Sequence, residues 1–504
     1  MKYLSLFKLL IATFFCCQTF LVAAQRNQIT DNNITNRVET EMAWQMDLPA
    51  DRIDVETKNN IVVLKGTVNN ILAKERAVNL AGAIRGVRGV IDEIKVDPPA
   101  MDDADLQQNI QDALYEDPAA DSYEVSVSVN SGKVFMTGVV QSWREKQLSE
   151  SVVKGVKGVK DVQNNLTVAF TMERPYNEIK NEIEQALNND IRLYPNTIEV
   201  LVKGRQVWLE GTVGSVSELN LAKSYAMTAG VSDVNTEGLK IEPWANNINL
   251  RQKPFPILSD DKIEKAIKDV FLYDSRVMHM NPTVTVNNGV VTLRGSVNNL
   301  KAKRAAEADA RNVVGVAMVR NNLKVRPDQI PADNILVERV ESALGRNPDV
   351  DRYDIMVTAW SGQVYLDGEV DTYFEKNKAE DIASNVKGVV KIINDLDVYF
   401  DSDTDYLYPN GSNEYFYPTP YSSPKTYYTY PLTDFQVKDN IEDELWWSPF
   451  VNKFAIEVEV TRGVATLSGT VNSWAERQAA IENAYEGGAT SVIDNLTFEA
   501  NAAN

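Results

Sequence analysis

The chain has 504 residues, a hydrophobic fraction of 44% and a formal net charge of −20. This length exceeds what one hydrophobic core can organise, so several domains are expected. The acidic excess repels polyanions over most of the surface, which excludes generic nucleic-acid binding and leaves nucleic acid outside the predicted partners.

Residues 1–24 have the layout of a secretory signal peptide. Lys2 and Lys8 precede the apolar run 9–15, and Val22 and Ala24 satisfy the small-residue rule for cleavage. We therefore predict cleavage near Ala24 and a periplasmic product, with secretion as the alternative. Loss of the two lysines takes the net charge from −20 to −22.

Cys16 and Cys17 lie inside this segment and raise the alternative of a lipoprotein. Phe14 and Phe15 stand where a lipobox requires small residues, which disfavours lipidation. Cleavage after Ala24 removes both cysteines, so the mature chain would have no disulfide and no Cys ligand for a metal. No other apolar run approaches the ~20 residues that span a bilayer.

A seven-residue phrase recurs six times along the remaining chain, first as Val62–Val68. In each copy the residues four and two before a central Gly, and two after it, are apolar, which is the period of a strand with one buried face. The Gly falls on that same face, where a missing Cβ lets a helix or a neighbouring backbone come close. We therefore predict six structural glycines: Gly66, Gly138, Gly211, Gly295, Gly368 and Gly469.

A larger unit surrounds each of these glycines. About thirty residues before the Gly, apolar residues recur at i, i+4 and i+8 and predict a short amphipathic helix. A hairpin turn such as Asn288-Gly289 precedes the Gly strand, and a second helix such as 300–312 follows it. A Gly-Val phrase then ends that helix and begins a third strand. The predicted helix stripes are Val38/Met42/Met46, Leu106/Ile110/Leu114, Ile179/Ile183/Leu187, Ile263/Ile267/Phe271, Leu336/Val340/Leu344 and Val437/Ile441/Leu445.

The predicted fold class is therefore α+β, a tandem array of six small αββαβ modules. Each module is expected to be a three-stranded mixed sheet with two helices on one face. Modules 1 to 6 are predicted at 31–97, 102–170, 174–242, 260–326, 333–398 and 434–499, with linkers at 243–259 and 399–433.

The linker 399–433 is rich in Tyr, Pro, Ser and Asp and has neither helical nor strand periodicity. This composition predicts an exposed, partly disordered segment. The alternative is contact of its tyrosines with a membrane interface or with sugars. The segment is too short to fold alone as a catalytic domain.

Two phrases at a fixed spacing carry a family resemblance. Val-x-Leu-x-Gly-x-Val, followed about twenty residues later by Gly-Val-x-x-Val-x-Asn-x-Leu, resembles the BON domain of bacterial exported proteins. The resemblance covers nearly the whole mature chain in six copies, although Ala465 and Ala489 replace the usual Val in the sixth. It implies an αββαβ module of envelope proteins, several of them linked to osmotic and membrane stress, with proposed binding to phospholipid surfaces and no catalytic residues.

A search for chemistry finds little. His279 is the one histidine, and no nucleophile, metal-ligand or phosphate-loop spacing accompanies it, so we interpret it as a structural or surface residue. The acidic pair Asp102-Asp103 carries no information in so acidic a chain, and Asp260-Asp261 is interpreted as a helix N-terminal cap. We predict no enzyme activity, no catalytic residue, no metal and no cofactor.

Charge separates the modules more clearly. Module 4 has twelve Lys and Arg against seven Asp and Glu, whereas module 6 has four against twelve. In module 4, three cations share one sector of the second helix, and four others are expected on the open face of the sheet. We predict that these seven form an anionic-lipid patch; the alternatives are a solvated face, or pairing with an acidic neighbour such as module 5. The residues are Arg294, Lys301, Arg304, Arg311, Arg320, Lys324 and Arg326.

The leading hypothesis is a non-enzymatic, exported, multivalent binding protein of the cell envelope. Its predicted partners are membrane phospholipid or an envelope protein, contacted weakly by each module and strengthened by repetition, in protection against membrane or osmotic stress. The alternative is a structural scaffold whose modules self-assemble into rings or filaments.

Overall fold

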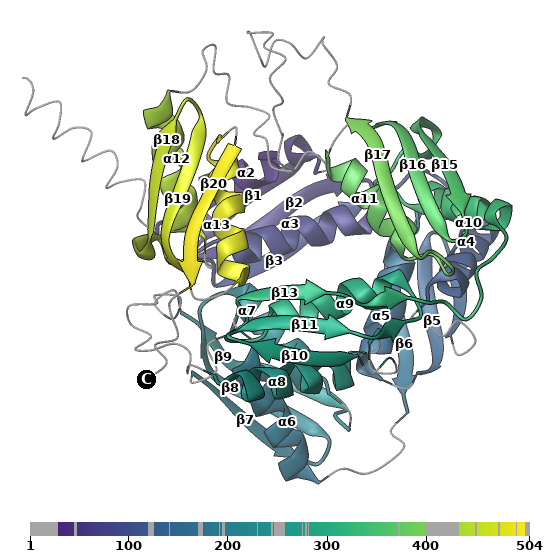
Figure 1. Cartoon of the computed structure of the whole chain (residues 1–504), viewed down its shortest axis with the longest axis horizontal. Coiled ribbons are helices and arrows are strands. Elements are labelled where there is room, and N and C mark those ends of the chain that lie inside the picture. The colour runs from purple at the N-terminus through teal and green to yellow at the C-terminus, as the bar shows by residue number, and fades with distance from the viewer. Residues whose placement is uncertain are drawn as a thin grey trace, which may run out of the picture.

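The computed structural model describes residues 29–44, 48–118, 125–140, 142–169, 175–190, 192–193, 197–228, 230–242, 245, 258–274, 276–277, 280, 282–370, 373–398, 433–448, 451–471, 474–489 and 491–498. Within them the chain forms six αββαβ modules, so the predicted fold class is confirmed (Figure 1). The predicted signal peptide, His279 and nearly all of the two long linkers lie outside the described residues.

Every module begins with an amphipathic helix that packs on its sheet. The predicted apolar stripes are buried in modules 2 to 6. In module 1 the buried stripe is Ile34, Val38 and Met42, so it begins one turn earlier than predicted, and Met46 lies outside the described residues. These first helices are α2 (Asp31–Trp44), α4 (Asp103–Glu116), α6 (Tyr176–Asn189), α8 (Asp260–Tyr273), α10 (Asp333–Arg346) and α12 (Asp434–Trp447).

A two-residue hairpin follows each first helix. Positive φ occurs in the turn, for example 48° at Asn288 and 73° at Gly289, as such hairpins require. In module 3 the turn residue with positive φ is Gly204, at 62°. The first strands are β1 (Ile53–Lys58), β4 (Val125–Asn130), β7 (Ile198–Lys203), β10 (Thr283–Asn287), β15 (Ile355–Trp360) and β18 (Ile456–Thr461). The second strands, which contain the repeated phrase, are β2 (Ile61–Val68), β5 (Lys133–Val140), β8 (Gln206–Val213), β11 (Val290–Arg294) with β12 (Ser296–Val297), β16 (Gln363–Val370) and β19 (Val464–Val471).

A second helix crosses over to a third strand, which pairs in parallel with the second strand. The second helices are α3 (Ile71–Ala83), α5 (Trp143–Lys154), α7 (Val216–Ala226), α9 (Leu300–Arg311), α11 (Tyr373–Ser384) and α13 (Trp474–Glu486). The third strands are β3 (Gly89–Val96), β6 (Asp161–Val168), β9 (Asp233–Ile241), β13 (Met318–Asn321) with β14 (Lys324–Val325), β17 (Lys391–Val398) and β20 (Ser491–Phe498). Both helices cover one face, so every module has its own core and one open sheet face.

The modules are folded on one another rather than strung out. Figure 1 shows modules 4, 5 and 6 nearer the viewer, each lying against one of modules 1, 2 and 3. The residue contacts give the pairing as 1 with 6, 2 with 5 and 3 with 4. The chain therefore doubles back, and its last module meets its first.

Modules 2 and 5 exchange equivalent backbone hydrogen bonds. The N–H of Lys157 donates to the carbonyl of Arg346 at 2.7 Å, and the N–H of Lys387 donates to the carbonyl of Glu116 at 3.2 Å. Arg346 and Glu116 are the last residues of α10 and α4, whose carbonyls have no partner within the helix. Each module thus caps the other's first helix.

Modules 3 and 4 share one such backbone hydrogen bond, in which module 4 donates and module 3 accepts. The N–H of Val314, which follows α9, donates to the carbonyl of Asn189 at the end of α6, at 2.8 Å. Modules 1 and 6 meet through side chains instead. Arg37 of α2 pairs with Glu444 of α12, and Trp447 joins the buried core of module 1.

Candidate functional site

Four cationic side chains stand exposed on the open face of the module 4 sheet. Along residues 319–326, Arg320, Lys324 and Arg326 alternate with Val319, Leu323 and Val325, which pack on the core, so strand geometry directs the cations outward. Arg294 ends β11 and is also exposed. The strands β10 to β14 contain no Asp or Glu, so this face has no carboxylate of its own. We call these four residues the cationic face: Arg294, Arg320, Lys324 and Arg326.

Register spreads the cationic face along the central and third strands. Arg320 pairs with Thr292 and Lys324 pairs with Ser296, so Arg294 on the central strand lies between the rows of these two cations. The N–H of Lys324 donates to the carbonyl of Gly295 at 3.0 Å. The open faces of other modules differ, because β18 of module 6 presents Glu457 and Glu459 at its exposed positions.

The three helix cations of the predicted patch lie on the other side of the sheet and are engaged by neighbouring side chains. Lys301 pairs with Asp117 of module 2 at 2.5 Å. Arg304 pairs with Glu380 of module 5 at 2.5 Å. This agrees with the alternative prediction that cations of module 4 pair with acidic module 5. Arg311 pairs with Glu307 one turn earlier on α9. The seven predicted residues therefore divide into a surface group and a group in ion pairs.

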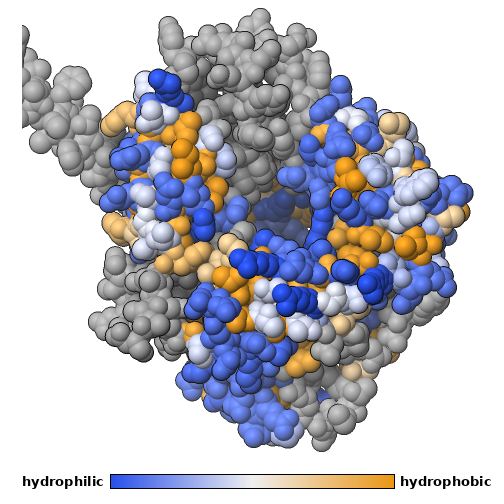
Figure 2. Space-filling view, viewed as in Figure 1, coloured by the Kyte–Doolittle hydropathy of each residue, from blue (hydrophilic) through white to orange (hydrophobic). Residues whose placement is uncertain are grey.

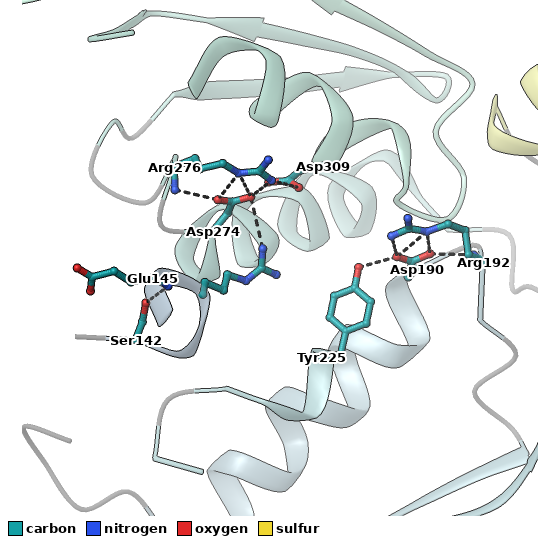
Figure 3. A network of polar contacts seen from close by, with 9 residues as sticks. Ser142, Glu145, Asp190, Arg192, Tyr225, Asp274, Arg276 and Asp309 are labelled. Atoms are coloured by element: carbon teal, nitrogen blue, oxygen red, sulfur yellow. Dashed lines mark hydrogen bonds and ion pairs between the residues drawn. The ribbon is translucent and has the colours of Figure 1, made fainter. Parts of the chain in front are cut away.

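A polar network joins modules 2 and 4 beside Lys301. Asp274 ends α8 and accepts hydrogen bonds from the backbone N–H of Arg276 at 2.8 Å and from its Nε at 3.0 Å. Arg144 of module 2 reaches the same carboxylate at 3.4 Å. Figure 3 shows Asp309 beside this pair. Lys301 and Arg144 are both the second residue of their helices, α9 and α5. Each forms an ion pair with the aspartate that follows the first helix of the other module, Lys301 with Asp117 and Arg144 with Asp274.

The two aspartates of this network differ in pKa. Burial alone would raise the pKa of Asp274, but the hydrogen bonds and charge of Arg276 and the charge of Arg144 outweigh it and lower the pKa to about 2. Burial and the neighbouring Asp274 raise the pKa of Asp309 well above its usual range. The pair therefore holds one proton at a pH where two isolated carboxylates would hold none.

Module 3 carries a related network. Asp190, at the end of α6, accepts hydrogen bonds from Arg192 Nε at 3.0 Å and from the Tyr225 hydroxyl at 2.5 Å (Figure 3). Burial, followed by the charge of Asp190, raises the pKa of Tyr225 far above its usual value. Sequence reasoning missed both networks, although a signal exists: Asp-x-Arg follows the first helix in modules 3 and 4.

The repeated glycines prove to be backbone devices rather than core residues. Gly66 has φ +136°, and a Cβ there would lie 1.9 Å from the carbonyl oxygen of Arg52. The equivalent distances at Gly211, Gly368 and Gly469 are 2.0, 2.1 and 2.1 Å. The close approach of a neighbouring backbone was therefore predicted correctly. The predicted burial of these glycines was wrong, because all of them are at least partly exposed.

The residue fourteen positions before each of these four glycines supplies the close carbonyl. For Gly295 that residue is Asn281, which lies outside the described residues. Gly295 stands where the sheet of module 4 is interrupted, and its positive φ of +119° favours glycine.

An aspartate at the first position of a helix fastens that helix to its hairpin. The carboxylate of Asp103 accepts the N–H groups of Ser131 at 2.7 Å and of Gly132 at 3.0 Å. Asp260 binds the turn of module 4 in the same way, and Ser259 is the residue that precedes the helix, so the interpretation of Asp260 as its N-terminal cap is wrong. Asp102 is the N-cap of α4 and accepts the N–H of Ala104 at 2.9 Å. Module 3 has Tyr176 at this position.

The described residues meet the requirements of neither a metal site nor a membrane-spanning helix. Among them, no cluster of three or more His, Cys, Asp or Glu is arranged to hold a metal ion. Across the same ranges, no helix has both the length and the apolar character needed to cross a bilayer.

Comparison with known families assigns all six modules. The model of the BON domain matches residues 30–98, 102–169, 177–243, 259–327, 332–398 and 433–500. The chain belongs to the BON domain family. Each match contains one αββαβ unit, apart from Tyr176 at the start of α6, so the suspected six tandem BON repeats are confirmed.

Relatives cover only part of this BON protein. It is 34% identical over 141 residues to the outer membrane lipoprotein DolP of Haemophilus influenzae. The aligned region covers 27% of this chain and 72% of DolP. It is 29% identical over 147 residues to the osmotically-inducible protein Y of Escherichia coli K12, covering 28% of this chain and 73% of that protein. Each match has the length of two BON modules.

A solved structure is also similar, at a low level. The C-terminal domain of CdsD, a structural protein of the type III secretion system of Chlamydia trachomatis, is 17% identical over 45% of this chain and 100% of that domain. Its TM-score of 0.13 supports no conclusion about assembly.

Proposed function

We propose that this chain is a non-enzymatic, exported envelope protein that contacts anionic phospholipid surfaces through the cationic face of BON module 4. The names of the relatives, an outer membrane lipoprotein and an osmotically inducible protein, support an envelope role under stress. The single observation that carries the lipid contact is the set of exposed cations on a sheet face without carboxylates.

The expected strength follows from the number of charges. Each Lys or Arg held near an anionic membrane contributes about 1 kcal/mol, and the contribution falls with salt. Four such residues therefore give at most about 4 kcal/mol, or roughly a thousandfold in affinity. Lys301, Arg304 and Arg311 add little, because neighbouring carboxylates already neutralise them.

The test compares two full-length variants with equal loss of charge. One replaces all four residues of the cationic face by Gln. The control replaces Lys180, Lys262, Lys265 and Lys268, which lie on α6 and α8, by Gln. Flotation with vesicles containing about 30% phosphatidylglycerol at low salt measures binding.

We expect the cationic-face variant to lose at least tenfold in binding and the control to change less than threefold. Wild-type binding should weaken steeply as salt rises. Equal binding by both variants, or binding that does not respond to salt, would overturn the proposal. Sedimentation without lipid checks the scaffold alternative, which requires large closed oligomers or filaments.

A further inference from the structure

The open face of BON module 5 carries two large, exposed apolar side chains on its edge strand. On this strand, β15, Met356 is 61% exposed and Trp360 is 69% exposed, whereas Val357 and Ala359 between them face the core. Strand alternation therefore directs the two large side chains away from the helices. The hairpin turn at residues 361–362 follows Trp360 directly.

This open face is polarised along its strands. At the turn end, Trp360 pairs with Gln363, which pairs with Lys391, and no carboxylate is present in that row. Four residues further along β16, Met356 pairs with Asp367, which pairs with Asp395. The turn end is thus aromatic and weakly cationic, and the opposite end is acidic.

The turn end of module 5 adjoins the cationic face of module 4. Arg326 is followed after four residues by Ile330, which is exposed. The Cγ2 atom of Ile330 lies 3.4 Å from the position of a Cβ on Gly362, in the turn beside Trp360. Figure 2 shows the same juxtaposition, with orange atoms at the edge of module 5 next to deep blue atoms of module 4.

We infer that the turn end of module 5, with Trp360 and Ile330, inserts between the headgroups of an anionic bilayer while the cationic face of module 4 contacts their phosphates. This rests on the proposed function, to which it adds a second, uncharged contact. The indole of Trp360 suits the membrane interface because its ring is apolar and its N–H is polar.

Charge favours a bilayer, rather than a groove on another protein, as the partner that contacts the turn end of module 5 and the cationic face. A bilayer surface is broad and flat, so the apolar tip and the cationic face can bind it together. The acidic end of module 5, with Asp367 and Asp395, would be repelled by anionic lipid, which keeps that end away from the membrane and leaves the turn end facing it.

The experiment uses the full-length chain and vesicles of about 30% phosphatidylglycerol in phosphatidylcholine. Trp360→Ser is compared with Phe454→Ser, because Phe454 is 74% exposed on the acidic module 6. Neither residue is buried, so both variants should fold, which near-ultraviolet circular dichroism checks. Flotation is measured at low salt and at high salt, where the charge contribution is screened.

We expect Trp360→Ser to lower vesicle binding about tenfold at both salt concentrations and to leave the salt dependence unchanged. Phe454→Ser should bind as the wild type does. In addition, brominated lipid should quench the fluorescence difference between the wild type and Trp360→Phe, which places the indole within the bilayer.

The outcomes separate the two proposals. If the wild type does not bind vesicles, the proposed function fails and this inference fails with it. If the wild type binds with the expected salt dependence but Trp360→Ser binds equally well, only the insertion is refuted. The insertion is also refuted if Trp360→Ser leaves vesicle binding intact and instead abolishes association with an envelope protein.

Discussion

Replacement of Arg37 by Met tests whether modules 1 and 6 are held together by a buried ion pair. Arg37 is 8% exposed and Glu444 is 3% exposed, and the guanidinium also contacts Glu41 on its own helix. Removing the cation leaves the Glu444 carboxylate buried beside other acidic groups. Removing one partner of such a pair typically costs about 3–5 kcal/mol.

Hydrogen exchange of the backbone amides in α12 measures this cost directly. A loss of 3–5 kcal/mol corresponds to exchange that is faster by about two to nearly four orders of magnitude, at 1.4 kcal/mol per tenfold. The control is Lys265→Met, which breaks an exposed pair with Asp269 and should cost at most about 0.5 kcal/mol.

The double variant Arg37→Met/Glu444→Met sharpens the prediction. With both charges gone, no uncompensated carboxylate remains, and protection of α12 should return close to the wild-type value. If Arg37→Met speeds exchange less than threefold, or if the double variant is no better protected than the single one, the ion pair does not hold the two modules together.

Three further changes test individual features of the modules. Gly66→Ala should cost about 2 kcal/mol or more in urea unfolding, because φ is +136° and the new Cβ would meet the carbonyl oxygen of Arg52. Asp103→Ala should cost about 1–2 kcal/mol, since two turn N–H groups lose a charged acceptor. Because the pKa of Asp309 is raised, the folded state loses stability as pH rises from about 4 through that pKa. Asp309→Asn should reduce this loss, which thermal unfolding measured from about pH 4 to pH 8 would show.

The repeat made the fold predictable. Periodicity alone located the buried stripe of five first helices, such as Leu106, Ile110 and Leu114, and the turn signal at Asn288-Gly289 located a hairpin. These features depend on contacts within one module, where sequence spacing fixes which residues meet. The core position assigned to Gly66 failed because strand alternation gives a side-chain direction and says nothing about the carbonyl that approaches it.

The candidate site was harder to predict because two of its seven residues, Lys301 and Arg304, form ion pairs with other modules. Helix periodicity placed Lys301 and Arg304 on one exposed sector of α9, which is correct for an isolated module. Their partners, Asp117 and Glu380, lie 184 and 76 residues away in sequence, and no periodicity connects them. The strand cation Arg320 was placed correctly because its neighbours lie within its own sheet.

The packing also changes what repetition can do for binding. Avidity requires that several sites engage one surface at the same time, and it is lost where geometry prevents this. In this chain the open faces differ in chemistry, from the cationic face of module 4 to Glu457 and Glu459 on module 6. Modules 4 and 5 are joined by a short connection at Ile330, so their two contacts can act together. Under the proposed function, modules 4 and 5 would contact an anionic membrane as a pair, and the other four modules would form the body that holds this pair in place.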